Sequence, residues 1–593
     1  MDGDPGETLV LRGDPLALLE SSPIFRGLDT ATLAAISAEL DWLALPGGAT
    51  LFDAGEPSDA MYIVIAGCLG AYSGGDAPRL LGRIPAGETV GEMGLVSGHN
   101  RSATVRALRD SDLARLPRES FDRVILQHPA AMLRVAQLLV ARLESHERRD
   151  PGPGPRTYTV VPQSIEVDVG GFATDLVAAL RRHGRAELVW SVRGADHTSA
   201  WFHRIESGND YVVYVADPEP TTWSKLCVRQ ADSLLFVARA EAPAAPWPVG
   251  TGEPAAATVS ARAELVLLHE TRIEPGAAAR WSRQFPGVAH HHVREPADVE
   301  RIARLLTGKA VGLVLSGGGA RGFAHIGVVR ALREAGVAID LVGGTSMGAI
   351  MGAGVAAGWS TAEMIERFRR AFVATNPLSD YTLPIVSLVA GRKVSRLLRQ
   401  EFGDISIEDL PLPFYAVSAN LTTGHGSVHR QGDLWRWLRA SVAIPGVLPP
   451  VFHHGEVHVD GGAINNMPVD VMRGSHAGVV IGVDVGSDTT FTSDIQDVDL
   501  PSLWKLLGWF RRHKQRPTIL QILWRAGMVN SDAAAQAGRR LTDLLLQPPL
   551  ADVDLLNWHA FDRAIEAGYR HANERLAGLD DAGRARLGLA ARG

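Results

Sequence analysis

Residues 311–357 contain, twice in succession, an apolar strand-like run that passes through glycines into a helical stretch. The first unit reads VGLVLSGGGARG and is followed by helical spacing from Phe323. The second is centred on Leu341 and reaches GTSMG before helical spacing from Ala349. Strands that alternate with helices in this way predict a parallel sheet. We therefore expect an α/β fold for residues 309–593.

The second glycine turn, Gly344-Thr345-Ser346-Met347-Gly348, has the spacing of a nucleophile elbow. In such an elbow a sharp turn between a strand and a helix projects a serine hydroxyl above the sheet, and the flanking positions accept only glycine. The start of the following helix also stabilises negative charge that develops nearby. Ser346 is therefore the predicted nucleophile, with Gly344 and Gly348 as supporting residues.

The first glycine loop has three interpretations. Its GGGARG sequence fits the G-x-G-x-x-G spacing of a dinucleotide site, which also needs an acidic residue at the end of the next strand. Asp340 lies at about the right distance, but at the beginning of that strand, whose end holds the serine turn. The N–H groups of Gly317, Gly318 and Gly319 would instead form an oxyanion hole, while Arg321 would anchor the loop or a phosphate. A tight structural turn is the third interpretation.

A serine nucleophile needs a base, and a candidate lies far downstream. Residues 455–467 read GEVHVDGGAINNM, in which apolar Val457 and Val459 precede Asp460 at the predicted end of a strand. A carboxylate there is well placed to accept the serine proton directly. Asp-Gly alone more often marks a turn, so Asp460, with Gly461 and Gly462, gains its weight from the two upstream motifs.

The GGGARG loop, which includes Gly322, the GTSMG turn and the Asp-Gly-Gly segment together resemble the patatin-like phospholipases. The resemblance continues through ANLTTGHGSVHR, LWRWLRASVAIPGVLPP and INNMPVD, and the two upstream domains make it specific to the neuropathy target esterase branch. It implies a three-layer α/β/α hydrolase domain that cleaves carboxylic esters of phospholipids or lysophospholipids. It also implies a Ser346–Asp460 dyad, an oxyanion hole at Gly317–Gly319, and no metal or organic cofactor for catalysis.

Two other functions stay open. In a Ser-His-Asp esterase the base would be one of the histidines that follow Ser346, namely His425, His429, His453, His454, His458 or His476. Alternatively, the hydrolase domain is inactive and the chain is a scaffold that responds to cyclic nucleotide. The run His290–His292 is a weak metal candidate, because consecutive residues of a strand point to opposite faces.

Two domains are predicted upstream of the hydrolase region. Residues 15–149 combine short strands at regular, glycine-marked intervals with flanking helices, which predicts a small β-roll. DPGPGPR, at residues 150–156, is typical of a linker. Residues 157–308 alternate strand-like and helical stretches, which predicts a doubly wound, Rossmann-like domain. Its first loop, PQSIEVDVGG, lacks the glycine pattern that admits a pyrophosphate, so we expect no nucleotide there.

The segment VGEMGLVSGHNRSATVRA, at residues 90–107, predicts a phosphate-binding cassette in the β-roll. Arg101 and Ser102 would hold a cyclic phosphate, Glu92 would accept a ribose hydroxyl, and Gly91 would allow close backbone approach. With SSPIFRGLD, this segment resembles the cyclic nucleotide-binding domains, except that Asn100 stands where proline is common. The candidate regulator is cAMP or cGMP. The alternative is a remnant that binds no nucleotide.

The composition limits partners and location. Lys and Arg total 59 against 66 Asp and Glu, a net charge of -7, so no global attraction to nucleic acid is expected. Cys68 and Cys227 cannot form a disulfide framework, and no secretory signal is visible, so we expect a cytoplasmic location. The uncharged run at 341–359 predicts a buried strand, turn and helix. LWKLLGWFRRHKQR, at 503–516, suits either peripheral contact with the inner membrane face or a packed helix with a basic end.

Overall fold

The computed structural model describes two compact units. Unit 1 holds the described residues up to Leu268 together with 284–290, and unit 2 holds 269–283 and the described residues from His291 onward. Of the linker expected at 150–156 only Arg156 is described, and the membrane-contact candidate at 503–516 lies outside the described residues. These residues are 19, 25, 29–74, 80–127, 156–164, 166–191, 199–219, 221–244, 262–475, 478–486, 522 and 531–590.

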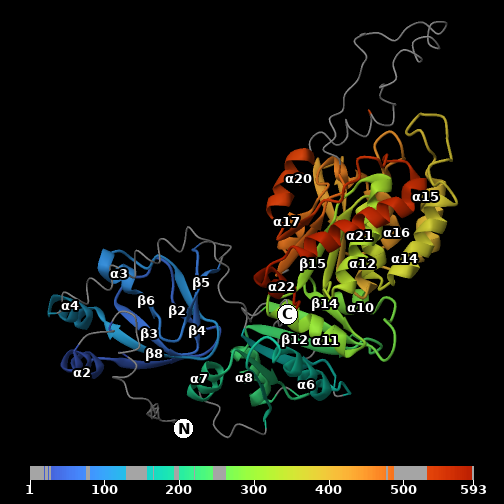
Figure 1. Ribbon diagram of the computed structural model, residues 1–593. Coiled ribbons are helices and arrows are strands. Elements are labelled where there is room, and N and C mark those ends of the chain that lie inside the picture. The colour runs from blue at the N-terminus through green and yellow to red at the C-terminus, as the bar shows by residue number, and fades with distance from the viewer. Residues whose placement is uncertain are drawn as a thin grey trace, which may run out of the picture. The chain divides into compact units, whose positions relative to one another are not determined.

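Unit 1 begins with two four-stranded sheets, of order β1-β8-β3-β6 and β2-β7-β4-β5 (Figure 1). Strand β3 places Met61 and Ile63 in one apolar cluster and Tyr62 and Val64 in another, as the two faces of a strand require. The predicted β-roll is confirmed. Its elements are α2 Thr30–Ala38, β1 Asp41–Leu45, β2 Thr50–Phe52, β3 Ala60–Ala66, β4 Cys68–Tyr72, β5 Leu80–Pro85, β6 Thr89–Val90, α3 Glu92–Ser97, β7 Thr104–Ala107, β8 Ser111–Pro117 and α4 Arg118–Gln127.

The second sheet system of unit 1 has the order β10-β11-β9-β12-β13-β14, with parallel pairing from β10 to β13. The Rossmann order would place the second strand beside the first, whereas here β11 separates β10 from β9. Alternating strands and helices predict parallel pairing but do not specify which neighbour each crossover reaches. The elements are β9 Thr157–Pro162, α6 Val169–Leu180, β10 Ala186–Val189, α7 Ser199–Gly208, β11 Tyr211–Val215, α8 Thr222–Gln230, β12 Ser233–Arg239, β13 Arg262–Leu268 and β14 Ala289–Val293.

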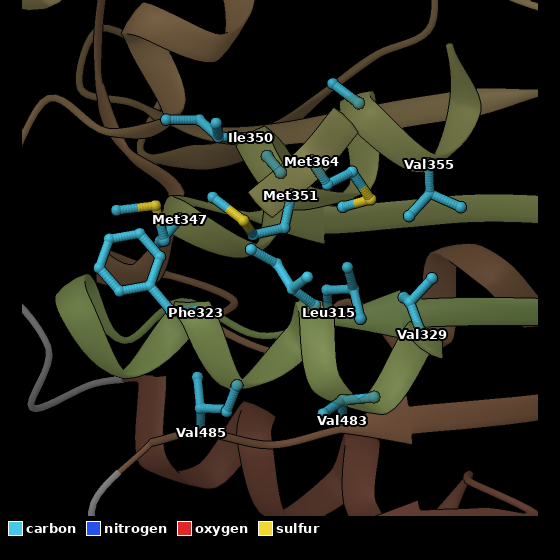
Figure 2. Packing of buried hydrophobic residues seen from close by; sticks show 14 of the residues in the cluster. Leu315, Phe323, Val329, Met347, Ile350, Met351, Val355, Met364, Val483 and Val485 are labelled. Carbon is cyan, nitrogen blue, oxygen red and sulfur yellow. The ribbon is translucent and has the colours of Figure 1, made fainter. Parts of the chain in front are cut away.

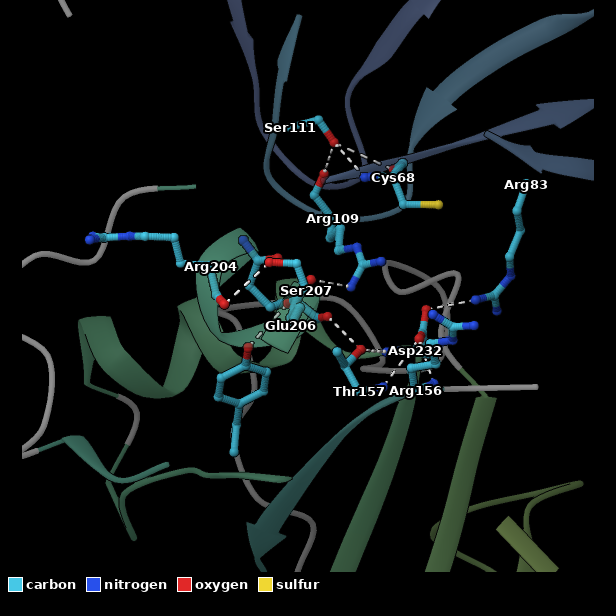
Figure 3. Close-up of polar contacts among 12 residues, drawn as sticks. Cys68, Arg83, Arg109, Ser111, Arg156, Thr157, Arg204, Glu206, Ser207 and Asp232 are labelled. Carbon is cyan, nitrogen blue, oxygen red and sulfur yellow. Dashed lines mark hydrogen bonds and ion pairs between the residues drawn. The ribbon is translucent and has the colours of Figure 1, made fainter. Parts of the chain in front are cut away.

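Arginine–carboxylate pairs join the β-roll to the parallel sheet within unit 1 (Figure 3). Arg109 lies 2.8 Å from Glu206, and both side chains are largely buried. Arg83 Nη1 lies 2.6 Å from Asp232 Oδ1. The Arg229 guanidinium donates to both carboxylate oxygens of Asp110, at 2.9 and 3.0 Å. Buried or bidentate pairs of this kind give geometric specificity to a contact.

Unit 2 is built on a sheet of order β19-β20-β17-β16-β15-β21-β22, with β18 paired to β17. Strands β17, β16, β15, β21 and β22 are parallel neighbours, while β20 is antiparallel to β17. β16 and β20 run in opposite directions, but their last residues meet beside β17, because Thr345 pairs with Val417 and Asp460 pairs with Ser418. The strands are β15 Val311–Leu315, β16 Leu341–Thr345, β17 Phe414–Asn420, β18 His425–His429, β19 Val451–His453, β20 Glu456–Asp460, β21 Val479–Val483 and β22 Leu544–Leu546.

Helices cover both faces of this sheet, as the burial of alternate strand residues demonstrates. Leu313 and Leu315 belong to the larger apolar cluster, whereas Val314 belongs to a second cluster with Met472. Figure 2 shows side chains from α12 and α13 filling the larger cluster. The helices are α10 Ala277–Ser282, α11 Pro296–Leu306, α12 Ala324–Glu334, α13 Met347–Ala356, α14 Thr361–Phe368, α15 Arg392–Phe402, α16 Leu434–Ser441, α17 Val469–Arg473, α20 Ser531–Arg540, α21 Phe561–Ala577 and α22 Asp581–Arg586.

The structure also shows where the two cysteines and the uncharged run lie. Cys68 and Cys227 are buried free thiols. The uncharged run at 341–359 folds as β16, a turn and α13. None of the helices in the described part of the chain combines the length and the apolar character that crossing a bilayer requires.

Candidate active site

Ser346 forms the turn between β16 and α13, with a φ of 54° and a ψ of -127°. A residue with a Cβ rarely adopts this conformation, and it persists where the surrounding structure imposes it. The neighbouring glycines are required by close packing. A Cβ on Gly344 or Gly348 would lie 2.8 or 2.2 Å from the Leu315 carbonyl oxygen, and one on Gly322 would lie 2.3 Å from Cγ of Met347.

Asp460, the last residue of β20, faces Ser346. Ser346 Oγ donates a hydrogen bond of 2.7 Å to Oδ2 of Asp460, whose Oδ1 accepts one of 2.8 Å from the Gly462 N–H. The side chains are almost fully buried, with 4% and 1% of each residue exposed. The turn after Asp460 is tight, since a Cβ on Gly461 would lie 2.2 Å from the Val417 carbonyl oxygen.

The surroundings of Asp460 place its pKa near neutral pH. Burial raises the pKa of Asp460 to about 7, although the hydrogen bonds from Ser346 and from the Gly462 N–H act in the opposite direction. A general base is most effective when its pKa lies near the working pH, because it can then both take up and release a proton. The Ser346–Asp460 pair therefore has the distance and the proton affinity of a nucleophile and its base.

The end of α16 holds both members of the pair in place. Ser441 Oγ accepts a hydrogen bond of 2.8 Å from the Ser346 N–H and donates one of 2.6 Å to the Val417 carbonyl. The N–H of Asp460 donates to the Ala443 carbonyl at 2.9 Å. The sequence analysis assigned no role to Ser441. It lies in LWRWLRASVAIPG, a segment that resembles the patatin-like phospholipases, and this resemblance could have indicated a role near the site.

The glycine loop leaves two of its three predicted N–H donors open. The Gly317 N–H donates to Asn466, 3.1 Å from its side-chain oxygen, and the Asn466 amide donates back to the Gly317 carbonyl at 3.2 Å. No described residue accepts a hydrogen bond from the N–H of Gly318 or Gly319. Gly319 has a φ of 56°, and a Cβ there would lie 2.2 Å from the Leu555 carbonyl oxygen. The prediction that all three amides face the substrate therefore does not fit Gly317.

Two residues that were considered for ligand binding make structural contacts. Arg321 Nε donates a hydrogen bond of 2.7 Å to the Val553 carbonyl, which anchors the glycine loop. Asp340 pairs with Arg304 at 2.7 Å and accepts a hydrogen bond of 3.0 Å from the Val311 N–H. Because these contacts hold Asp340 at the start of β16, it is not placed to bind a ribose. The acidic residue that a dinucleotide site requires is therefore missing.

A small apolar pocket lies next to Ser346. Ser346 is the one polar side chain among its lining residues, so the pocket suits an apolar chain that carries a reactive group at one end. The other lining residues are Gly319, Met347, Ile350, Phe372, Pro377, Leu378, Val394, Val442, Ile444, Leu448, Leu555, Leu556 and Trp558.

No described histidine hydrogen-bonds to Ser346 or Asp460. His429 and His458 lie 2.7 and 3.0 Å from the Ser418 hydroxyl on β17 instead, and burial lowers the pKa of His429 to about 3. His425 bonds to the Thr423 carbonyl, and His453 packs against His454. His476 lies outside the described residues. The arrangement offers no support for a Ser-His-Asp triad.

The weak metal candidate at 290–292 also has other contacts. His291 and His292 are buried, and His292 Nδ1 lies 2.8 Å from Nε2 of His269. Within the described ranges, no group of three or more His, Cys, Asp or Glu residues could hold a metal ion.

The predicted cyclic-nucleotide residues lie in the β-roll. Gly91 and Arg101 are in contact, with a hydrogen bond of 3.1 Å from Arg101 Nη1 to the Gly91 carbonyl. Glu92, at the start of α3, is buried, and Ser102 is exposed. The Arg101 guanidinium is buried and lies 3.0 Å from Asp59 Oδ1. An incoming phosphate would therefore have to share or replace this carboxylate.

Comparisons with known proteins match three parts of the chain. Residues 313–473 match the patatin-like phospholipase family, and 155–311 match the Neuropathy Target Esterase family P-loop like domain. Lysophospholipase nte1 of Neosartorya fischeri is 30% identical to the chain, over 96% of this chain and 44% of its own length. The chain therefore carries a patatin-like phospholipase domain and a domain of the Neuropathy Target Esterase family. Residues 42–128 match the cyclic nucleotide-binding domain family.

The curated relatives are longer than this chain. Lysophospholipase NTE1 of Saccharomyces cerevisiae is 27% identical over 95% of this chain and 43% of its own length. The chain thus spans less than half the length of these curated relatives. Among solved structures, the Thermus thermophilus Catabolite Activator Protein is 26% identical, with a TM-score of 0.20, over 27% of this chain and 68% of that protein.

Proposed function

We propose that this protein is a serine hydrolase of lipid carboxylic esters, with phospholipids or lysophospholipids as substrates. The observation that carries the proposal is the 2.7 Å hydrogen bond from Ser346 to a buried Asp460, beside an apolar pocket. Relatives named lysophospholipase add support. A fatty acyl chain in the pocket would bring its ester carbonyl to the Ser346 hydroxyl.

In the proposed reaction Ser346 Oγ attacks the acyl carbonyl carbon while its proton passes to Oδ2 of Asp460. The carbonyl oxygen becomes an anion, which the open N–H groups of Gly318 and Gly319 and the N-terminus of α13 would stabilise. When the tetrahedral intermediate collapses, the carbon–oxygen bond to the alcohol breaks and Asp460 returns the proton to that oxygen. Water, deprotonated by Asp460, then attacks the acyl carbonyl. The carbon–oxygen bond to Ser346 breaks, Asp460 returns the proton to Ser346 Oγ, and the fatty acid leaves.

The dyad predicts how activity depends on pH. The base must be ionised before attack, and the pKa of Asp460 is raised to about 7. Below that value kcat/KM for a lysophospholipid is expected to fall about tenfold per pH unit, and above it to reach a plateau. The profile should be measured with an assay of released fatty acid. Activity that stays constant down to about pH 5 would contradict a base with this pKa.

We also propose that the β-roll binds a cyclic nucleotide, with Arg101 exchanging Asp59 for the cyclic phosphate. Calorimetry on the full chain with cAMP and cGMP tests this. Arg101→Gln is expected to weaken binding at least about tenfold, because it removes a charge-assisted hydrogen bond. Arg115→Gln is the matched control, since Arg115 contacts the same Asp59 at 2.9 Å from a more exposed position. Absence of binding to the wild type at millimolar nucleotide would leave the β-roll as a structural domain.

A further inference from the structure

Residues 381–386, between α14 and α15, expose several large apolar side chains. We call this segment the apolar loop. Tyr381, Leu383, Ile385 and Val386 are 77%, 78%, 87% and 59% exposed. Single exposed apolar residues are common on proteins, but several together mark an interaction site. The amphipathic character of tyrosine also suits a boundary between water and an apolar phase.

The base of the apolar loop is fixed to the rest of unit 2. The N–H of Thr382 donates to the Leu388 carbonyl at 3.1 Å, and that of Ala390 donates to the Asp380 carbonyl at 2.8 Å. The N–H of Leu388 in turn donates to the Gly446 carbonyl at 2.9 Å. In Figure 1 the yellow segment beside α15 projects from the domain. The loop thus presents its apolar side chains outward from an anchored base.

Residues on both sides of the apolar loop line the pocket at Ser346. Pro377 and Leu378, a few residues before the loop, line that pocket, and so does Val394 just after it. Gly446, which holds the loop base, lies between the pocket residues Ile444 and Leu448. The chain segments on both sides of the loop therefore form part of the pocket wall at the candidate nucleophile.

Basic side chains flank the apolar loop. Helix α15 carries four exposed cations within eight residues: Arg392, Lys393, Arg396 and Arg399. Asp380 is the one acidic residue between positions 375 and 399, although the whole chain has a net charge of -7. Apolar side chains next to cations match a phospholipid surface, whose acyl region accepts the first and whose phosphates attract the second.

We propose that the apolar loop and the cations of α15 dock on a phospholipid surface, so that an acyl chain passes from the lipid layer along the loop into the pocket. This proposal rests on the proposed lipid-ester hydrolysis, but it assigns the membrane contact to residues 381–399. A second copy of the chain covering the loop is the competing occupant.

The experiment uses the full chain, the double variant Leu383→Ser/Ile385→Ser, and Leu81→Ser as control. Leu81 is 45% exposed and lies on β5 of unit 1. Binding to vesicles of phosphatidylcholine, alone or mixed with phosphatidylglycerol, is measured by flotation. The loop variant is expected to bind both at least about tenfold more weakly, because two apolar side chains no longer enter the lipid. It should keep wild-type turnover of a soluble short-chain ester, whereas the control should match the wild type in every assay.

A second variant tests the cations. Arg392→Gln/Arg396→Gln should weaken binding to the phosphatidylglycerol vesicles and leave binding to phosphatidylcholine alone nearly unchanged. Equal vesicle binding by wild type and loop variant would overturn the proposal, as would a loop variant that changes only the oligomeric state in sedimentation. A different result would show that the proposed ester hydrolysis itself is wrong. The wild type would then hydrolyse neither soluble nor vesicle-borne ester, whatever its affinity for vesicles.

Discussion

Ser346→Ala is expected to lower kcat for lysophospholipid hydrolysis by about 10⁴-fold or more. Ser346 Oγ is the atom that would carry the acyl group in the acyl-enzyme. Among the described side chains, only that of Ser346 donates a hydrogen bond to Asp460 Oδ2. Loss of a nucleophile in enzymes of this type removes all of the covalent catalysis and leaves only the contribution of the oxyanion hole and of binding. The measurement is fatty acid release under saturating substrate.

A control separates chemistry from folding. Ser475→Ala removes another hydroxyl of unit 2, one that donates to the Val471 carbonyl, and should leave turnover unchanged. Ser346→Gly should be as inactive as Ser346→Ala but should unfold at a higher temperature, because glycine adopts a φ of 54° without a Cβ. Turnover by Ser346→Ala within about tenfold of wild type would place the nucleophile elsewhere.

Asp460→Asn should have opposite effects on activity and stability. Without a carboxylate the serine proton has no acceptor, so kcat is expected to fall about 10³-fold or more. The native pKa of Asp460 is raised from its ordinary value of 3.8 to about 7. Between these values the native state keeps a proton that the unfolded state has released, so the free energy of unfolding decreases as pH rises through this window.

Asparagine cannot titrate, so the variant avoids this loss of stability. The unfolding temperature of Asp460→Asn relative to wild type is expected to increase from about pH 5 to about pH 8, by the equivalent of about 2–4 kcal/mol for unit 2. Thermal unfolding followed at several pH values measures this difference. A difference that does not change with pH would mean that the native pKa of Asp460 is not raised.

The sequence predicts the parts of the fold that depend on local pattern. Apolar runs and glycines were sufficient to expect the strand–turn–helix at Ser346, because the residues that mark this turn follow one another in the sequence. The order of strands β10, β11 and β9 was not predictable, because it depends on which neighbour a crossover reaches.

Contacts between residues far apart in the sequence could not be predicted either. The Gly317 N–H donates a hydrogen bond to Asn466, which is 149 positions away in the sequence. The Ser346 N–H donates one to Ser441, which is 95 positions away. The contact of Asp59 with Arg101 likewise changes how the nucleotide site must be understood. Each of these polar groups is ordinary in the sequence, and only burial beside its partner gives it a role.

The account depends on Ser346 being a nucleophile that Asp460 activates. The most direct measurement is mass-spectrometric mapping of the adduct formed with a fluorophosphonate, in wild type and in Asp460→Asn. We predict a single phosphonyl group on Ser346 of the wild type, formed at least about 10²-fold faster than in the variant. An adduct on another residue, or none on Ser346 while ester hydrolysis proceeds, would contradict the account.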